Sequence, residues 1–189
     1  MVAEAATALG GLDVLVNNAG ISGPTASVEQ MDPDAWESVM NVNLTGTFNV
    51  TRLAIPHLKQ SGNGVILVMS SLAGRFGYPN RSPYATTKWG SIGFTKTLSR
   101  ELGDFGIRVN AILPGAVDGP RIESVLEGRA AASGRSVAAE RAAALSNQSI
   151  KRFVAPEDIA ALAVFLASDA GRSISGQIVP IDGDSQSAS

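Results

Sequence analysis

Short runs rich in apolar side chains alternate along this chain with longer segments of helical periodicity. The short, mainly apolar run over 12–16 predicts a strand that is buried on both faces of a sheet, and the run over 65–69, which is fully apolar, predicts a second such strand. Glycine, proline or small polar residues follow these runs and end the strands. The predicted strands are 12–16, 65–69, 107–113 and 177–181.

The segments between the strands carry residues that begin and end helices. Asp32 caps one predicted helix with Pro33 in its first turn, and Ser82 caps another with Pro83 in its first turn. The first ten residues are typical of the end of an amphipathic helix. Strands that alternate with helices predict an α/β fold, a doubly wound parallel sheet with helices on both faces. The predicted helices are 34–60, 82–103, one or two surface helices within 118–149, and 156–167.

Length and charge narrow the class of protein. With 189 residues, 44% of them hydrophobic, the chain is long enough for one well-packed domain over 1–189, and no linker suggests a second. The formal net charge is −2 and the 15 basic residues are spread along the chain. We therefore expect no nucleic-acid partner and no membrane surface, and a small neutral or mildly acidic ligand instead. No apolar run approaches the ~20 residues that span a bilayer.

The chain contains no cysteine and one histidine, His57. This composition excludes disulfides, thiolate catalysis and metal sites built from cysteine or from clustered histidine. It suits a reducing cytoplasm, and the first ten residues lack the basic and strongly apolar regions of a signal peptide. We therefore expect a cytoplasmic protein without a metal, and we interpret His57 as a solvated residue.

Small and polar residues follow three of the predicted strands. The segment 17–20 (Asn-Asn-Ala-Gly) follows the first strand, Ser71 lies just after the second, and Pro114 with Gly115 ends the third. In open α/β sheets, ligands bind beyond the carboxyl ends of the strands. The three motifs therefore predict a ligand site along one edge of the sheet.

A tyrosine, a lysine and a serine near this edge suggest chemistry. Tyr84 and Lys88 lie four positions apart in a predicted helix, so their side chains share one face. An adjacent ammonium group favours the phenolate form of a phenol, which lets a tyrosine exchange a proton with an alcohol or a carbonyl. Ser71, thirteen residues before Tyr84, can donate a hydrogen bond to a carbonyl oxygen as charge develops there. The alternatives are a solvated, ion-pairing helix face for the pair and a turn cap for Ser71.

Together with Asn43 in the segment 41–46 (Asn-Val-Asn-Leu-Thr-Gly), these residues resemble the active site of the short-chain dehydrogenase/reductase family. The resemblance covers essentially the whole chain and implies a Rossmann-like sheet. It implies that Tyr84 is the catalytic acid or base and that Ser71 orients the substrate carbonyl. It also implies that Lys88 favours the phenolate and holds the nicotinamide ribose, while Asn43 holds a water in a proton relay to Lys88.

The resemblance also implies a nicotinamide coenzyme, either NAD or NADP. In many members a threonine follows Pro-Gly and binds the carboxamide, whereas this chain continues with Ala116, so we expect only backbone contacts there. Asn17 is expected to tie strands together. Besides Tyr84 and Lys88, the implied coenzyme-binding residues are Asn18, Ala19, Gly20, Pro114, Gly115 and Val117.

The family places a glycine-rich TGxxxGxG turn for the pyrophosphate well before its Asn-Asn-Ala-Gly motif, and only sixteen residues precede that motif here. The first βαβαβ segment, which takes about 60 to 80 residues, is therefore expected to be absent. Either Met1 is an internal methionine of a longer enzyme, or the short chain is real and exposes the edge of the strand at 12–16. The residues that discriminate NAD from NADP belong to the absent segment.

Three functions fit these observations. The resemblance is to the short alcohol/ketone and 3-oxoacyl reductases, and it favours an NAD(P)-dependent oxidoreductase that interconverts a secondary alcohol and a ketone. Such enzymes assemble as dimers or tetramers through the helix that bears Tyr84 and through the last strand. The alternative is a truncated, non-catalytic fragment that acts only through subunit association. An epimerase or dehydratase that uses the same Tyr-Lys pair is less favoured.

Two further segments give expectations, one about the substrate and one about disorder of the chain. The segment 118–149 is expected to cover the substrate and to set its identity. Its arginines either attract an acidic substrate or form a solvated helical face; they are Arg121, Arg129, Arg135 and Arg141. The segment 184–189 is a polar tail whose composition favours disorder. Trp36 and Trp89 are interpreted as packing residues, with Trp89 at a contact between subunits.

Overall fold

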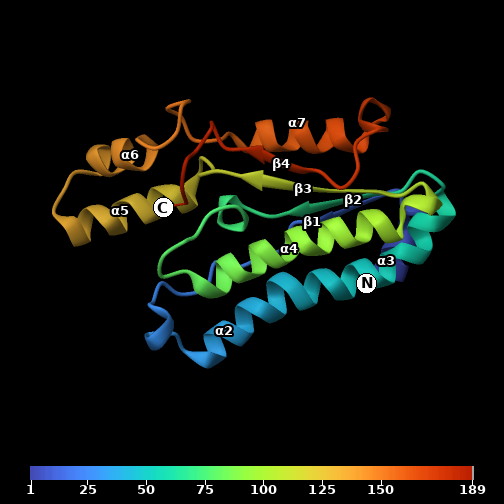
Figure 1. The fold of residues 1–189 in the computed structure, drawn as a ribbon, viewed down its shortest axis with the longest axis horizontal. Coiled ribbons are helices and arrows are strands. Elements are labelled where there is room, and N and C mark those ends of the chain that lie inside the picture. Colours follow the sequence, from blue (N-terminus) through green and yellow to red (C-terminus); the bar gives the residue numbers. More distant parts are fainter. Residues whose placement is uncertain (189) are drawn as a thin grey trace.

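A computed structural model describes residues 1–188, and it contains the four predicted strands as one parallel sheet (Figure 1). Ser189 at the end of the predicted tail, and the side chains of Arg121 and Ala132, lie outside the described residues. The strands pair in the order β1-β2-β3-β4, and all three pairings are parallel. Their bounds are Val14–Asn17 for β1, Val65–Met69 for β2, Arg108–Pro114 for β3 and Ile178–Ile181 for β4.

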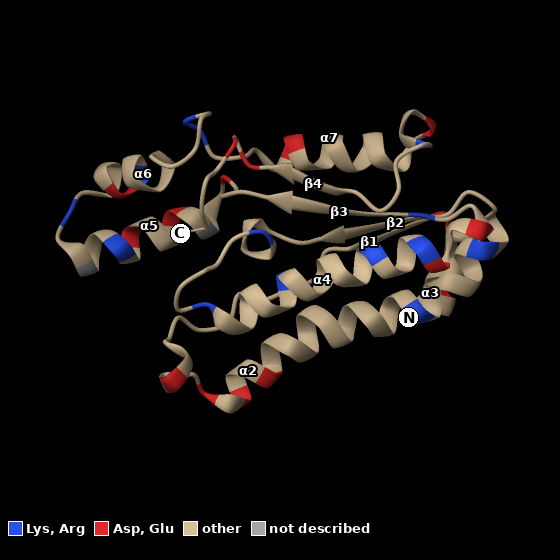
Figure 2. Ribbon diagram, in the orientation of Figure 1, with Lys and Arg blue, Asp and Glu red and all other residues tan. Residues whose placement is uncertain are grey.

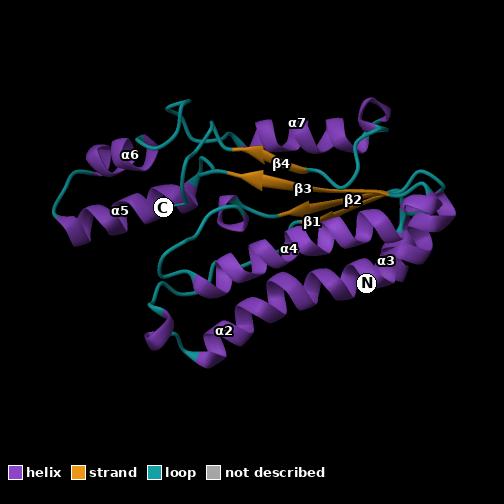
Figure 3. Cartoon of the chain, in the orientation of Figure 1, coloured by secondary structure: helices purple, strands orange, loops and turns teal. Residues whose placement is uncertain are grey.

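Helices cover both faces of this sheet (Figures 1 and 3). On one face lie α3 (Gly46–Ser61) and α4 (Ser82–Glu101), preceded by α2 (Pro33–Met40), while α1 (Val2–Leu9) packs against α3. The opposite face carries α7 (Pro156–Ala167). Beyond the carboxyl ends of the strands lie α5 (Pro120–Ser133) and α6 (Val137–Leu145). The expected doubly wound α/β architecture is therefore confirmed.

The alternation of side chains along β2 divides the hydrophobic core into two layers. Ile66 and Val68 pack with Leu58 of α3 and Leu98 of α4. Their neighbours in the strand point the other way and pack with Leu166 of α7. A parallel strand that is covered on both faces needs apolar side chains at every position, which explains the uninterrupted run over 65–69.

The expectation that the first strand is buried on both faces is wrong for β1. Val14 and Val16 are 40% and 46% exposed. They lie on the same side of the sheet as Val65 and Leu67, with which they pair in register. Among the described residues, the helix on that side, α7, covers β2, β3 and β4 and does not extend over β1, which is one of the two edge strands of the sheet.

Two helices differ in detail from the sequence expectation, one in its interior and one at its start. The predicted helix over 34–60 begins as expected, because Asp32 Oδ1 accepts a hydrogen bond from the Asp34 N–H at 3.0 Å, but a π-helical turn at Asn41–Thr45 interrupts it. The predicted cap Ser82 is instead the first residue of α4. The cap is Arg81, which makes no capping hydrogen bond through its side chain. A tight turn runs directly into this helix, since the Arg81 N–H donates to the Tyr78 carbonyl.

The polar segment after β4 is not disordered over its described part, 184–188. The Gln186 N–H donates to the Asn147 carbonyl at 3.0 Å, and the Ser149 N–H donates to the Asp184 carbonyl at 3.3 Å. Ser185 is buried, and its hydroxyl donates to Gln148 Oε1 at 3.1 Å. The polar groups of this segment, whose composition favoured disorder, therefore form hydrogen bonds with the segment between α6 and α7.

No helix within residues 1–188 combines the length and apolar character needed to cross a bilayer.

A buried arginine ties β3 to the end of α7. The Arg108 guanidinium donates to the carbonyl oxygens of Leu166 and Ala167 in the last turn of α7, which the end of a helix leaves without partners in the helix itself. It also donates to the Gly171 carbonyl in the turn that follows. Burial lowers the pKa of Arg108 from its ordinary value, and the Asp169 carboxylate partly opposes that shift. The guanidinium therefore serves as a multiple donor inside the fold.

Replacement of Arg108 by methionine is expected to lower the free energy of unfolding by about 2 to 4 kcal/mol, because several buried carbonyls lose their donor. Urea denaturation followed by circular dichroism measures the change. Arg100→Met, at an exposed position on α4, is the matched control and is expected to change stability by less than about 0.5 kcal/mol. Equal stability of the two variants would contradict this role for Arg108.

Candidate active site

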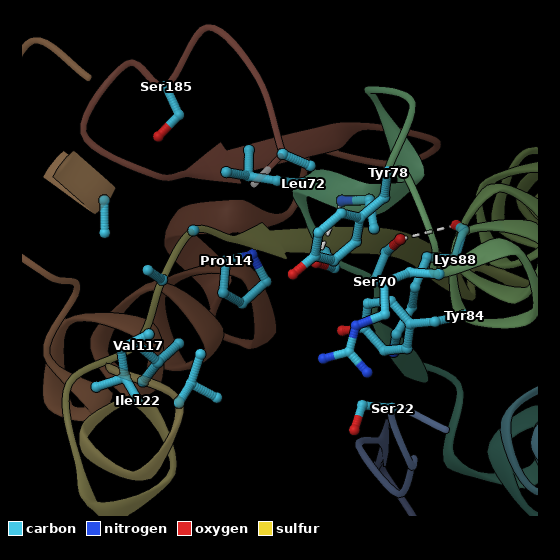
Figure 4. Close-up of a pocket in the computed structure, with 18 of the residues that line it drawn as sticks. Ser22, Ser70, Leu72, Tyr78, Tyr84, Lys88, Pro114, Val117, Ile122 and Ser185 are labelled. Carbon is cyan, nitrogen blue, oxygen red and sulfur yellow. Dashed lines mark hydrogen bonds between the residues drawn. The ribbon is translucent and has the colours of Figure 1, made fainter. Parts of the chain in front are cut away.

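A cavity of about 530 Å³ opens at the carboxyl ends of the strands (Figure 4). Its walls come from the ends of β1, β2 and β3, the first half of α4, and the segments from α5 to the chain's last described residues. Tyr78 and Tyr84 lie on the α4 side, Val117 and Ile122 lie across from them, and Ser185 approaches from the C-terminal segment. The sequence motifs at the three strand ends therefore meet around one cavity.

Most residues of the predicted site line this cavity. Asn43 and Ala19 do not line it. The predicted residues that do are Asn18, Gly20, Ser71, Tyr84, Lys88, Pro114, Gly115 and Val117. Asn17, expected to tie strands together, instead ties β1 to α3, because its amide nitrogen donates to Thr51 Oγ1 at 2.9 Å.

Tyr84 and Lys88 face the cavity from one side of α4. The Lys88 ammonium lies 5.5 Å from the centre of the Tyr84 ring, and the Lys88 residue is only 8% exposed. Its Nζ donates to the carbonyl oxygen of Met69, the last residue of β2, at 2.8 Å. The two side chains therefore lie together at the cavity, as expected for residues four apart in a helix.

Ser71 lines the same cavity, two residues after the end of β2. Its Oγ accepts a hydrogen bond from the Ala73 N–H at 3.3 Å, which is the turn cap considered as the alternative role. A hydroxyl has two acceptor lone pairs and one donor hydrogen. Because the cap uses only an acceptor position, the hydroxyl can still donate to a carbonyl oxygen in the cavity.

Asn43 lies behind the cavity on the π-helical turn. Its Nδ2 donates to the Ile21 carbonyl at 2.9 Å and to Thr87 Oγ1 at 3.0 Å, while its Oδ1 accepts from the Ile21 N–H at 2.8 Å. Both amide hydrogens are engaged, so the side chain joins the segment after β1 to α4. Only an acceptor position on Oδ1 remains for a water, and the proton relay stays a prediction.

The end of β2 and helix α4 approach each other closely at two residues that the sequence reading did not single out. Ser70 is buried, and its Oγ donates to the Lys88 carbonyl at 2.8 Å. A Cβ on Gly74 would lie 2.5 Å from Ser70 Oγ and 2.7 Å from the Lys88 carbonyl oxygen. Only a glycine at this position lets the loop after β2 pack this closely on the helix.

Other cavity residues also went unnoticed in the sequence. They come from loops and from the cover segment, where no periodicity or motif distinguishes a residue that faces a cavity from one that faces water. Only the general charge of the segment 118–149 offered a signal, through Arg129. The main residues that went unnoticed are Ser22, Tyr78, Arg81, Asn147, Gln148 and Ser185.

Basic and acidic residues are intermixed over the helices as a whole (Figure 2). The cavity differs, because three cationic side chains line it, from Arg81, Lys88 and Arg129, against one carboxylate, from Asp118. Asp118 is exposed, and its Oδ1 accepts from the N–H of the next residue at 3.1 Å. The cavity therefore carries an excess of positive charge in a protein of net negative charge.

Replacement of Gly74 by alanine is expected to force α4 away from β2, because the added methyl overlaps the Lys88 carbonyl and Ser70 Oγ. The expected loss in the free energy of unfolding is about 1 to 3 kcal/mol, measured by urea denaturation. Gly77→Ala is the matched control, since a Cβ there meets no atom within 4 Å. A Gly74→Ala variant as stable as Gly77→Ala would argue against the close approach.

Comparisons with known proteins find a matching family and similar enzymes. A family model described as enoyl-(acyl carrier protein) reductase matches residues 1–183. A 3-oxoacyl-(acyl-carrier-protein) reductase of Thermotoga maritima is 41% identical over 174 residues, which are 92% of this chain and 66% of that protein. A D-beta-hydroxybutyrate dehydrogenase of Cupriavidus necator is 40% identical over 184 residues, which are 97% of this chain and 71% of that protein.

Solved structures agree with these matches. NAD+-bound xylitol dehydrogenase superimposes with a TM-score of 0.89 at 28% identity, covering 96% of this chain and 72% of that one. Levodione reductase gives a TM-score of 0.88 at 32% identity, covering 96% and 69%. The chain thus spans about two thirds of the length of the relatives it matches. By the family match over residues 1–183 and by these relatives, the chain belongs to the short-chain dehydrogenase/reductase family.

Proposed function

We propose that this chain carries the catalytic part of an NAD(P)-dependent oxidoreductase that interconverts a secondary alcohol and a ketone. The observation that carries the proposal is the convergence of Ser71, Tyr84 and Lys88 on one cavity at the carboxyl edge of the sheet. Relatives named as a reductase and as a dehydrogenase support the reaction class. No cysteine or histidine cluster in the sequence competes as a catalytic centre.

The residues at the ends of β1 and β3 fit the nicotinamide end of a coenzyme. A Cβ on Gly20 would lie 3.2 Å from Asn43 Oδ1 and 3.7 Å from Lys88 Nζ, so the glycine keeps open the space next to the lysine. When bound, NAD or NADP supplies or accepts the hydride. The residues that would hold it are Asn18, Ala19, Gly20, Tyr84, Lys88, Pro114, Gly115 and Val117.

The side chains of the cavity account for the proton. In the reduction, the Tyr84 hydroxyl gives its proton to the carbonyl oxygen as the carbonyl carbon takes up the hydride. Ser71 donates a hydrogen bond to the same oxygen and orients it. Lys88, held by the Met69 carbonyl, stabilises the phenolate that remains. In the oxidation, the phenolate takes the proton of the alcohol.

A second candidate function is association without catalysis, and exposed apolar side chains on the outer helices offer a surface for association. Phe48 and Leu53 of α3 are both 50% exposed, and Trp89 of α4 is 52% exposed. Large apolar side chains gathered on an outer face commonly mark contacts between proteins. We propose that these residues contact a second copy of the chain, as a homo-oligomer of either the enzyme or the non-catalytic form.

Titration of the purified chain with NADH and with NADPH, followed by nicotinamide fluorescence, separates the two functions. The enzyme is expected to show saturable binding in the micromolar range. Size-exclusion chromatography of the same sample reports the oligomeric state. A stable oligomer with no affinity for either coenzyme would support association alone.

Tyr84→Phe is expected to lower kcat by at least about 100-fold with folding kept, because the ring still packs while the proton donor is lost. Coenzyme-dependent reduction of a panel of small ketones measures the change, and urea denaturation checks the fold. Thr97→Val removes an exposed hydroxyl elsewhere on α4 and is the matched control. Turnover by Tyr84→Phe equal to that of the control would exclude Tyr84 as the acid.

A further inference from the structure

Arg81 is the N-terminal cap of the helix that carries Tyr84, lies three positions before that tyrosine, and lines the same cavity. Residues three apart at the start of a helix lie close together on its surface. The ring of Tyr78 links the two, since it lies 5.8 Å from the Arg81 guanidinium carbon and 6.4 Å from the Tyr84 ring. A single small molecule whose oxygen reaches Tyr84 can therefore also reach Arg81.

The Arg81 guanidinium is held in place but keeps unused donors. Its Nη1 donates to the Gly23 carbonyl at 2.9 Å, and no other hydrogen bond of this side chain is present within residues 1–188. A guanidinium has five N–H donors in a planar fork that matches a carboxylate. Among the described residues, neither Arg81 nor Arg129 takes part in an ion pair; the arginines that do are Arg75, Arg135, Arg141 and Arg152.

The position of Arg81 is electrostatically unfavourable for the helix alone. The N-terminus of a helix carries partial positive charge and is stabilised by acidic or capping residues, whereas here a cation occupies the cap. The preceding residue, Asn80, has a φ of 61°, a conformation that few residues adopt. An anion bound at this point would be attracted by both the arginine and the helix N-terminus.

From these observations we propose that Arg81 binds a carboxylate of the substrate, so that the substrates are short oxo acids and the corresponding hydroxy acids. The proposal rests on the proposed oxidoreductase function and names the substrate class of that site. The excess positive charge of the cavity favours an anion there, and Arg129 on the facing cover segment adds to it. The carboxylate fixes the molecule at one end while its carbonyl group lies against Ser71 and Tyr84.

The reduction of oxo acids is compared with that of their methyl esters, which keep the ketone and lose the charge. The 2-, 3- and 4-oxo acids of four to six carbons, each with its methyl ester, are assayed with NADH and NADPH. At least one acid is expected to exceed its ester in kcat/KM. Arg81→Gln keeps an N–H donor for the Gly23 carbonyl, and the Ala26–Asn80 backbone hydrogen bond holds the same loop independently.

In Arg81→Gln, kcat/KM for the acid is expected to fall by about 10- to 100-fold, mainly through KM, with that for the ester changed less than about threefold. Arg81→Lys keeps the charge and is expected to recover part of the loss. Arg100→Gln, at an exposed position far along α4, is the matched control. An unchanged ratio of acid to ester in Arg81→Gln would overturn the proposal, as would a loss that appears only in Arg129→Gln.

A binding measurement separates this proposal from the proposed function. Saturation-transfer NMR compares butanoate with butanamide on the full chain, without turnover and with or without coenzyme. Preference for butanoate that disappears in Arg81→Gln supports the anion site even if no ketone is reduced, in which case only the oxidoreductase function fails. Reduction of ketones with equal use of acids and esters, and equal binding of butanoate and butanamide, would leave the enzyme standing and overturn the anion site.

Discussion

The contact between helix α4 and the end of strand β2 positions the rest of the site. The Lys88 carbonyl accepts hydrogen bonds from the hydroxyls of both Ser70 and Ser91, at 2.8 and 2.7 Å. The side chain of the same lysine returns to the strand, where its ammonium meets the Met69 carbonyl. Backbone and side chain of one residue are thus both tied at the point where β2 ends. This arrangement sets Tyr84, one helical turn earlier, opposite the loop that carries Ser71.

A second tie holds the end of β1 against the same helix. The π-helical turn inserts one extra residue into an otherwise continuous helical run from α2 to α3, and such turns are often found at functional sites. Asn43 on this turn reaches across to both the Ile21 backbone and Thr87 of α4. The sheet edge, the helix and the loop after β1 are therefore fixed to one another by buried polar groups. Such networks favour one arrangement, because an unpaired buried amide is costly.

The remaining walls of the cavity have a different character. They come from α5, α6 and the segment after β4, which contact one another through surface loops and polar side chains. In folds of this kind the scaffold is shared and the specificity comes from such loops. The cavity therefore combines a side held by buried hydrogen bonds with a cover made of surface helices and loops. Arg81 lies on the first of these sides, beside the helix that carries Tyr84.

Much of the fold and of the candidate site was determined by the sequence alone. The apolar run over 65–69 predicted β2 with its observed bounds, because a strand covered on both faces has no polar positions. Asp32 with Pro33 predicted the start of α2 through local capping chemistry. The spacing of Ser71, Tyr84 and Lys88 predicted one site, since strand ends in a parallel sheet share an edge and residues four apart in a helix share a face.

Only the tertiary structure decided what depends on contacts between distant segments. The exposure of Val14 and Val16 follows from where α7 lies, and the order of the polar segment after Asp184 follows from partners about 35 to 40 residues away. The need for glycine at position 74 and the cavity position of Arg81 likewise arise from packing between elements. Local sequence records the conformational preference of each segment. It does not record which of its polar groups, or which of its faces, another segment will meet.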